Sequence, residues 1–371
     1  MVRKLLYLNG LAILGVVLFH SAGTGFIAMF SWSHRYLAEG VSAASQIGSL
    51  SYYVLRLFEQ IAVFSLPAFI FVSGYFVSIQ AGRTGNIQWT SIRARIKSLL
   101  IPYLFWTLVI IFLGLLESKR YGAGQLIEML LTGSANPVLY FVPLIIQFYL
   151  LAPLFVSAAR KNWKVLLVIS LLLQILVITS QYPRFLGADP SWSLPLMNLV
   201  PKWLFLARIM WFPLGIIIGF HSEAVGKFLT RYWLWLLAGA ALLIPLGMIE
   251  WEIFFRMSGE AWLPHRETYI DTIYTLLMIF GVLGVQMKRL PFQAPTSTVG
   301  AKSYGIYLTH AIFIEYTARI IYVMAPALLA YQIILQPIFI LVGLGGPLLM
   351  MSIWDKIPIS RVRSSYAYIF G

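Results

Sequence analysis

The stretch Leu-Asn-Gly-Leu-Ala-Ile-Leu-Gly-Val-Val-Leu-Phe-His, residues 8–20, indicates how this chain folds. Its residues are apolar or glycine except for Asn9 and, at its end, His20. A helix needs about 20 residues of this kind to cross the hydrocarbon core of a bilayer. A membrane barrel would require alternating apolar and polar residues instead. The stretch therefore predicts a transmembrane helix.

Composition extends this prediction to the whole chain. Hydrophobic residues make up 60% and charged residues only 11% of the 371 residues, and the mean hydropathy is +0.83. Such values exclude an ordinary soluble protein. We predict an all-α polytopic integral membrane protein with a single domain, residues 1–371, and about ten transmembrane helices. The predicted spans are roughly 5–27, 58–80, 99–116, 138–157, 164–181, 203–220, 231–250, 271–287, 303–324 and 329–352.

The net charge of +14 has a topological explanation. With ten spans, more than half of the 27 Lys and Arg residues fall in segments on the same side as the two termini. Cytoplasmic segments are enriched in these residues, so we expect both termini in the cytoplasm and no nucleic-acid partner. Arg3-Lys4 before an apolar core also begins like a signal peptide, but no A-x-A cleavage site follows. We expect a multi-pass protein of the inner (plasma) membrane that keeps its first span.

Several kinds of site are excluded by residue type. The chain has no cysteine, which removes disulfides, thiolate metal sites and a cysteine-bound acyl intermediate. Its five histidines form neither an HExxH motif nor an i,i+4 pair, so we predict no metal site. The sequence has no glycine-rich phosphate-binding motif, so nothing in it indicates a nucleotide-driven pump.

His20 is the first candidate functional residue. An ionisable ring within a membrane segment is a functional candidate by default, although a helix-end histidine bonded to a carbonyl is an equally simple interpretation. The helical rise places His20 roughly 22 Å beyond Leu5, in the outer half of the membrane. His310 follows Lys302 by only eight residues, and we expect it nearer the inner half, close to a donor pocket or in helix packing.

Other polar residues have structural interpretations beside functional ones. Arg93, Arg95 and Lys97 either bind phosphate groups or act only as topological signals. Glu315 and Arg319 are four residues apart, and we favour simple mutual neutralisation on one helix face. For Ser73-Gly74 we favour a small-residue patch that permits close helix packing.

Taken in order, the motifs resemble one family. They are Val-Val-Leu-Phe-His20, Phe-Val-Ser-Gly-Tyr75, a basic run before Ile-Pro-Tyr103, Leu-Tyr-Phe-Val-Pro-Leu-Ile-Ile-Gln-Phe-Tyr-Leu-Leu-Ala-Pro153 and Ser-Tyr-Gly-Ile-Tyr-Leu-Thr-His310. Each motif alone is weak, but their shared order over nearly the whole chain is similar to the membrane acyltransferase-three family. That family comprises bacterial O-acyltransferases of surface glycans and related compounds.

The resemblance implies a reaction. An acyl-CoA in the cytoplasm, in the first place acetyl-CoA, would donate its acyl group to a hydroxyl of a glycan or other acceptor at the outer side. His20 would be the general base, either in direct transfer or through an acyl-histidine. Donor-binding candidates are Arg93, Arg95, Lys97 and Tyr103, and candidate site-lining residues are Asn9, Arg56, Ser73, Tyr75, Tyr140, Gln147, Tyr307, His310 and Glu315.

One residue departs from the family pattern. The family carries an arginine eleven residues before the first-helix histidine, where this chain has Asn9. Asparagine donates hydrogen bonds but has no charge. Either another cation substitutes, with Arg56, Arg93 and Arg95 as candidates, or this chain handles its donor differently. Two alternatives follow: a transporter or flippase of a lipid or saccharide, suited by Gly/Pro-interrupted spans and Arg208, and a non-catalytic scaffold of glycan assembly. Membrane lipids are expected partners, and nothing in the sequence indicates the acceptor or the oligomeric state.

Overall fold

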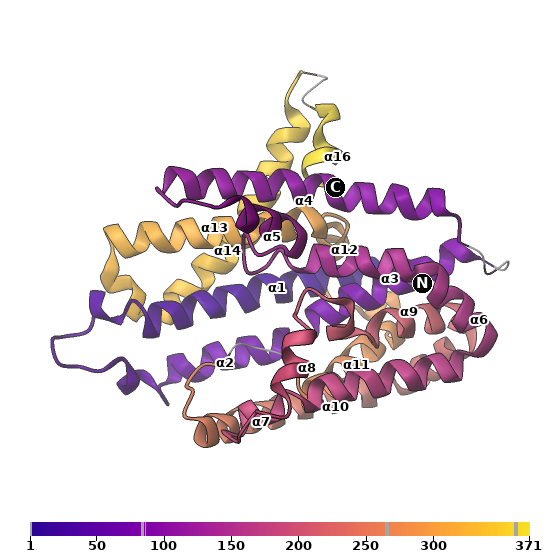
Figure 1. Ribbon diagram of the computed structural model, residues 1–371, viewed down its shortest axis with the longest axis horizontal. Helices are drawn as coiled ribbons and strands as arrows, with labels where there is room; N and C mark the ends of the chain where they lie inside the picture. Colours follow the sequence, from indigo (N-terminus) through magenta and orange to yellow (C-terminus); the bar gives the residue numbers. More distant parts are fainter. Residues whose placement is uncertain (1, 83–84, 86, 264–266, 360–362) are drawn as a thin grey trace. The chain divides into compact units, whose positions relative to one another are not determined.

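The all-helical prediction is confirmed. The computed structural model describes residues 2–82, 85, 87–263, 267–359 and 363–371, and helices make up 80% of the chain, with no strand among these residues. The main helices are α1 (Val2–Phe30), α2 (Leu50–Ala62), α3 (Ser65–Ala81), α4 (Trp89–Leu116), α5 (Ala123–Thr132), α6 (Phe141–Thr179), α7 (Tyr182–Phe185), α8 (Leu194–Leu199), α9 (Trp211–Phe220), α10 (Ser222–Ser258), α11 (Tyr269–Gly284), α12 (Gln293–Ala301), α13 (Ser303–Met324), α14 (Gln332–Lys356) and α16 (Tyr366–Ile369) (Figure 1). Short 3-10 helices are η1 (Ser33–Arg35), η2 (Ala43–Gln46), η3 (Phe205–Arg208), η4 (Met287–Arg289) and η5 (Pro326–Ala330).

Six helical segments within the described ranges are long and apolar enough to cross a membrane. α9 and α11 are apolar but shorter, with 10 and 16 residues. Most of the predicted spans fall on one helix, but 58–80 covers the end of α2 and most of α3, and 203–220 covers η3 and α9. The number ten and the side of the termini stay predictions. The six segments are Val2–Phe30, Leu50–Ala81, Trp89–Leu116, Phe141–Phe185, Ser222–Ser258 and Gln332–Lys356.

The chain forms two compact units. The first consists of Met1–Ala68, Pro183–Ala188 and Gly226–Ser352. Within it α1 packs against α2, α11, α12 and α13. Glycines permit the closest approach: a Cβ on Gly10 would collide with the carbonyl of Thr296, and one on Gly300 would collide with the carbonyl of Leu6. Because backbone cannot rotate away as a side chain can, these two positions fix how α1 and α12 sit together.

The second unit consists of Phe69–Tyr182, Asp189–Val225 and Ile353–Gly371. Within it α6 packs against α4, α9 and η3. α3 and α9 approach closely because Gly74 lies against the Phe212 carbonyl and Gly215 against that of Phe71. This contact supports the packing interpretation of Ser73-Gly74.

α6 contains the most abrupt bend in this unit. The sequence predicted two spans joined by a few residues, and the structure has helical residues on both sides of Asn162, whose own φ and ψ of −159° and 85° are not helical. The Asn162 side-chain Oδ1 accepts a hydrogen bond from the Val165 amide at 3.2 Å. The second half of α6 is thus capped in the manner of a new helix.

The C-terminal helix α16 packs on α4 of the same unit. The Trp106 indole Nε1 donates to the Ile369 carbonyl at 2.8 Å. Phe370 is only 2% exposed and its ring lies near those of Trp106, Trp354 and Tyr366. The last residues of the chain are therefore part of a packed core.

Candidate active site

Two histidines of the first unit lie next to each other on neighbouring helices. The imidazole centroids of His20 on α1 and His310 on α13 are 5.2 Å apart, with the rings tilted by 45°. The expectation that they lie at different depths is wrong. It counted residues from the ends of two predicted spans. Gly300 of α12, three residues before α13 begins, instead lies against Gly10 of α1. Each histidine follows its glycine by ten residues, which accords with two rings that lie side by side.

His310 has a fixed hydrogen-bonding arrangement. The residue is fully buried, and its Nδ1 lies 2.8 Å from the Tyr307 carbonyl and 3.1 Å from that of Ile306. Carbonyl oxygens only accept, so Nδ1 must carry the hydrogen. In the neutral ring Nε2 then bears the lone pair, and this buried atom has no hydrogen-bond partner among the described residues. A buried acceptor without a donor is costly and marks a candidate functional group.

His20 is half-buried and lies within α1 rather than at its end. The helix continues to Phe30, and the His20 carbonyl accepts a hydrogen bond from the Thr24 hydroxyl at 2.9 Å. Its ring meets the edge of Phe19, with centroids 5.5 Å apart. The interpretation of His20 as a helix-end histidine therefore does not hold.

A row of rings on α13 leads away from the histidine pair. Tyr307 is 4% exposed, and its ring centroid lies 6.1 Å from that of His310 and 6.4 Å from that of Tyr304.

Asn9 lies on the same face of α1 as His20. Eleven residues separate the two, which places them about 16 Å apart along the helix. The Asn9 Oδ1 atom is buried and has no hydrogen-bond partner in the described part of the chain.

A glutamine pair on α14 packs against Gly25 of α1 and was not found from the sequence. Gln336 donates from Nε2 to Oε1 of Gln332 at 3.0 Å, and Gln332 donates to the Leu329 carbonyl. The Gln336 Oε1 is buried and lacks a partner among the residues described. A Cβ added to Gly25 of α1 would meet both amides. The sequence signal that could have identified this pair is the presence of two glutamines four residues apart in an apolar segment.

Arg56 is buried in the first unit, with 5% exposure. Its Nη2 donates to the Tyr52 hydroxyl and to the Ala261 carbonyl, both at 2.6 Å. One turn further on α2, Glu59 accepts from the Trp262 indole at 3.1 Å and Gln60 donates to Asp271 at 3.0 Å. These contacts hold α2 to the segment before α11 and to α11 itself.

The donor-binding candidates lie on α4 of the second unit. Arg93, Arg95 and Lys97 are exposed in its first turns. Arg95 donates from Nε to the Tyr149 hydroxyl of α6 at 3.2 Å. Tyr103 is 1% exposed, and its hydroxyl lies 2.9 Å from the Leu130 carbonyl of α5. Tyr103 therefore links two helices, while the three cations are exposed at the start of α4 and Arg95 is already engaged with Tyr149.

The remaining candidates have mainly structural contacts. Gln147 donates to the Trp203 carbonyl at 2.9 Å and accepts from the Phe205 amide at 3.2 Å, which ties α6 to the segment around η3. The Tyr140 ring lies 4.7 Å from the Lys202 ammonium. Tyr75 is 2% exposed in α3, where Ser73 is half-buried.

Glu315 and Arg319 form an ion pair on α13, as the i,i+4 spacing indicated. Both side chains are partly exposed, so the pair neutralises its own charges on one face of the helix. Within the described residues no group of three His, Asp or Glu side chains could hold a metal ion.

The comparison with family models decides the class of protein. A model described as "Acyltransferase domain" matches residues 4–353, nearly the whole chain. The chain belongs to the acyltransferase 3 family. It is a membrane acyltransferase in the general sense that this family has. No curated protein and no solved structure matches the chain.

Family membership directs attention to the first unit of this acyltransferase. The matched region contains both histidines, Asn9 and the α14 glutamines. Their unpartnered acceptor atoms, Asn9 Oδ1, His310 Nε2 and Gln336 Oε1, are carried by three helices, α1, α13 and α14. Hydroxyl and amide donors are what such atoms bind, so each of these acceptors could take a hydrogen bond from a polar substrate.

Proposed function

We propose that this acyltransferase transfers an acyl group, in the first place acetyl, from cytoplasmic acyl-CoA to a hydroxyl of a glycan or other acceptor at the outer side of the inner (plasma) membrane. Both termini are cytoplasmic in this proposal. The observation that carries it is the pairing of His20 with a fully buried His310 inside a family of acyltransferases. Ionisable rings are expensive within a membrane, and two adjacent ones are hard to explain as packing alone.

His20 acts as the general base in the proposed reaction. Its unprotonated nitrogen takes the proton of the acceptor hydroxyl while the hydroxyl oxygen forms a bond to the thioester carbonyl carbon. The carbon–sulfur bond then breaks, and the leaving CoA sulfur takes the proton back from His20. An imidazole can both accept and return a proton, which suits it to both halves of this step.

His310 supports His20 in this scheme. With its hydrogen on Nδ1 directed to backbone carbonyls, the His310 Nε2 can only accept a hydrogen bond. An acceptor beside His20 favours the imidazolium that forms when the proton is taken. In a catalytic triad the third residue likewise orients the histidine base and stabilises its protonated form without taking up the proton itself.

The CoA phosphates are held by Arg93, Arg95 and Lys97 in this proposal. All three are exposed cations at the start of α4, and charge-assisted bonds to phosphate are among the strongest polar contacts that proteins make. Asn9 leaves the first helix without the arginine expected there, so the donor charge must be met by residues elsewhere in the chain.

The test uses inverted membrane vesicles that contain the full-length protein. Acetyl-CoA labelled in the acetyl group is added to the exposed cytoplasmic face, and base-labile label in the envelope polysaccharide is measured. We expect transfer with the wild type and a loss of about a hundredfold or more with His20→Ala. His34→Ala is the matched control, because His34 is an exposed histidine in η1, outside α1, whose ring contacts Tyr322 of α13.

Each outcome has a defined meaning. Normal transfer by His20→Ala would remove His20 as the base. If the wild type moves a lipid or saccharide across the membrane without labelling it, the protein is a transporter. Absence of both activities, with assembly of other glycan enzymes dependent on the chain, would indicate a scaffold.

A further inference from the structure

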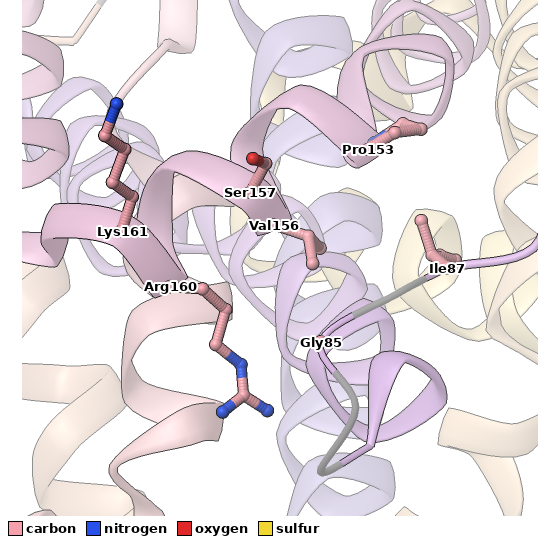
Figure 2. A pocket seen from close by; sticks show the side chains of 7 residues that line it. All are labelled: Gly85, Ile87, Pro153, Val156, Ser157, Arg160 and Lys161. Atoms are coloured by element: carbon pink, nitrogen blue, oxygen red, sulfur yellow. The ribbon is translucent and has the colours of Figure 1, made fainter.

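A cavity of about 430 Å³ lies in the second unit beside the bend of α6. It is lined by the last turns of α6 before Asn162 and by Gly85 and Ile87, which lie between α3 and α4 in the sequence (Figure 2). Its volume is in the range of sites that bind small molecules. The lining residues are Gly85, Ile87, Pro153, Val156, Ser157, Arg160 and Lys161.

Arg160 is held in place before any ligand binds. Its Nη2 donates to the Gly82 carbonyl at 2.5 Å, and its guanidinium carbon lies 4.1 Å from the ring centroid of Phe220. Gly85 has a φ of +70°, and a Cβ there would come within 3.0 Å of the Arg160 Nε atom. A glycine is required at this position for both reasons, because left-handed backbone and close approach each disfavour a side chain.

This arrangement leaves hydrogen-bond donors for a ligand. A guanidinium that stacks by its face on an aromatic ring still presents N–H groups along its edge. Among the described residues, Arg160 makes only the one hydrogen bond to Gly82. Ser157 adds a hydroxyl one turn earlier on α6, and the Lys161 side chain extends away from Arg160, so that it contributes charge over a longer distance (Figure 2).

The lining combines positive charge with apolar surface. No carboxylate is among the lining residues, while Ile87, Pro153 and Val156 supply an apolar wall. A basic pocket between membrane helices is suited to the head group of an anionic lipid. A guanidinium also pairs with phosphate oxygens through two parallel hydrogen bonds.

We propose that this cavity binds the phosphate of an amphipathic phosphate ester, with Arg160 as its principal ligand. A phospholipid head group and the phosphates of a nucleotide donor share this chemistry. The cationic lining residues, Arg160 and Lys161, are not those proposed to hold CoA on α4. Binding of a phospholipid here would not depend on the proposed acyl transfer, whereas binding of the nucleotide phosphates would rest on it. Its anchor, Arg160, is positioned by Gly82 and Phe220.

The experiment measures binding to the purified full-length chain in a neutral detergent by calorimetry. One arm compares short-chain phosphatidylglycerol with phosphatidylcholine of the same chain length, and the other compares CoA with 3′-dephospho-CoA. We expect Arg160→Gln to weaken the preferred phosphate probe by about ten- to a hundredfold, the effect of losing charge-assisted hydrogen bonds. Arg231→Gln is the control, since Arg231 is an exposed arginine of the first unit.

The two arms separate the sources of phosphate. A preference for phosphatidylglycerol that Arg160→Gln abolishes assigns a lipid, and a loss confined to CoA assigns the nucleotide. If Arg160→Gln does not fold, Lys161→Gln provides a second test. It should reduce the affinity for the phosphate probe by less than Arg160→Gln would, and this difference from the wild type should disappear at high salt. Equal binding of every probe by the wild type and both variants would overturn the proposal.

Discussion

His310 donates from Nδ1 to the carbonyls of Ile306 and Tyr307 in the preceding turn of its own helix. This bond fixes both the orientation of the ring and the position of its hydrogen, and it directs the lone pair of Nε2 into the protein interior. No other buried histidine in the described part of the chain has its second nitrogen without a partner. The side chain can therefore be dissected by substitutions that keep one nitrogen and remove the other.

His310→Asn and His310→Gln should differ for this reason. The Asn amide approximates the Nδ1 donor and removes the acceptor at Nε2, whereas the longer Gln can place its carbonyl oxygen near Nε2. We expect kcat to fall by about tenfold or more in His310→Asn, with the donor KM little changed and partial recovery in His310→Gln. Steady-state kinetics with varied acetyl-CoA measure both constants.

A purely structural His310 would behave differently. Both variants would then lose thermal stability to a similar degree, and their kcat values per folded molecule would remain close to that of the wild type. A rise in donor KM without a change in kcat would instead place His310 in the donor pocket, as the sequence alone suggested.

At the scale of helices, the first unit depends on a segment that hydropathy does not detect. α12 has nine residues, several of them Ser or Thr, and it lies outside every predicted span. The histidine pair follows from it, because the contact of Gly10 with Thr296 and of Gly300 with Leu6 sets the level of α13 beside α1. The sequence motifs identified both histidines but could not show that they meet.

Gly10→Ala tests this alignment. The added methyl group would collide with the Thr296 carbonyl of the packed backbone, so α1 and α12 must separate, at a cost of about 1–3 kcal/mol. We expect a lower midpoint of thermal unfolding in detergent together with reduced transfer, because His20 moves relative to His310.

Gly345→Ala provides the matched control. Gly345 is also a helical glycine of the first unit, and a Cβ there meets nothing within 4 Å. Alanine favours a helix over glycine by up to about 1 kcal/mol, so this variant should be as stable as the wild type or slightly more so. Similar destabilisation by both substitutions would show that the Gly10 contact is not special.

Other elements were predictable to different degrees. Continuous apolar runs were sufficient for helices such as α1, α4 and α14, since burial in lipid dominates their formation. The break of α6 at Asn162 was expected only as a short connection, because its form depends on a side-chain cap rather than on hydropathy. The Gln332–Gln336 pair was missed, since neutral amides in an apolar run give a weak signal by comparison with charges.

At the scale of the whole molecule, the distribution of Lys and Arg predicts on which side of the membrane each connection lies. Single cysteines report it cleanly, because the native chain contains none. We expect Thr90→Cys to react with a membrane-impermeant maleimide from the cytoplasmic side and Asn198→Cys from the outer side. Both positions are exposed in the structure.

Comparison of right-side-out with inverted vesicles decides the orientation. Reaction of Asn198→Cys only from the cytoplasmic side would reverse the topology, and with it the side from which His20 receives the acyl donor. Labelling of denatured protein controls for cysteines that are present but inaccessible.

The packing of α16 on α4 bears on how this acyltransferase should be dissected. The family match ends at residue 353, yet Ile369 accepts the Trp106 indole hydrogen and Phe370 fills the space beside that ring. A fragment cut at the border of the match would leave an apolar face and an unpaired indole N–H on the helix that carries Arg93 and Arg95. Loss of activity in such a fragment would then report damage to α4 and not a catalytic role of the tail. The end of the family match is thus a poor position at which to truncate this protein.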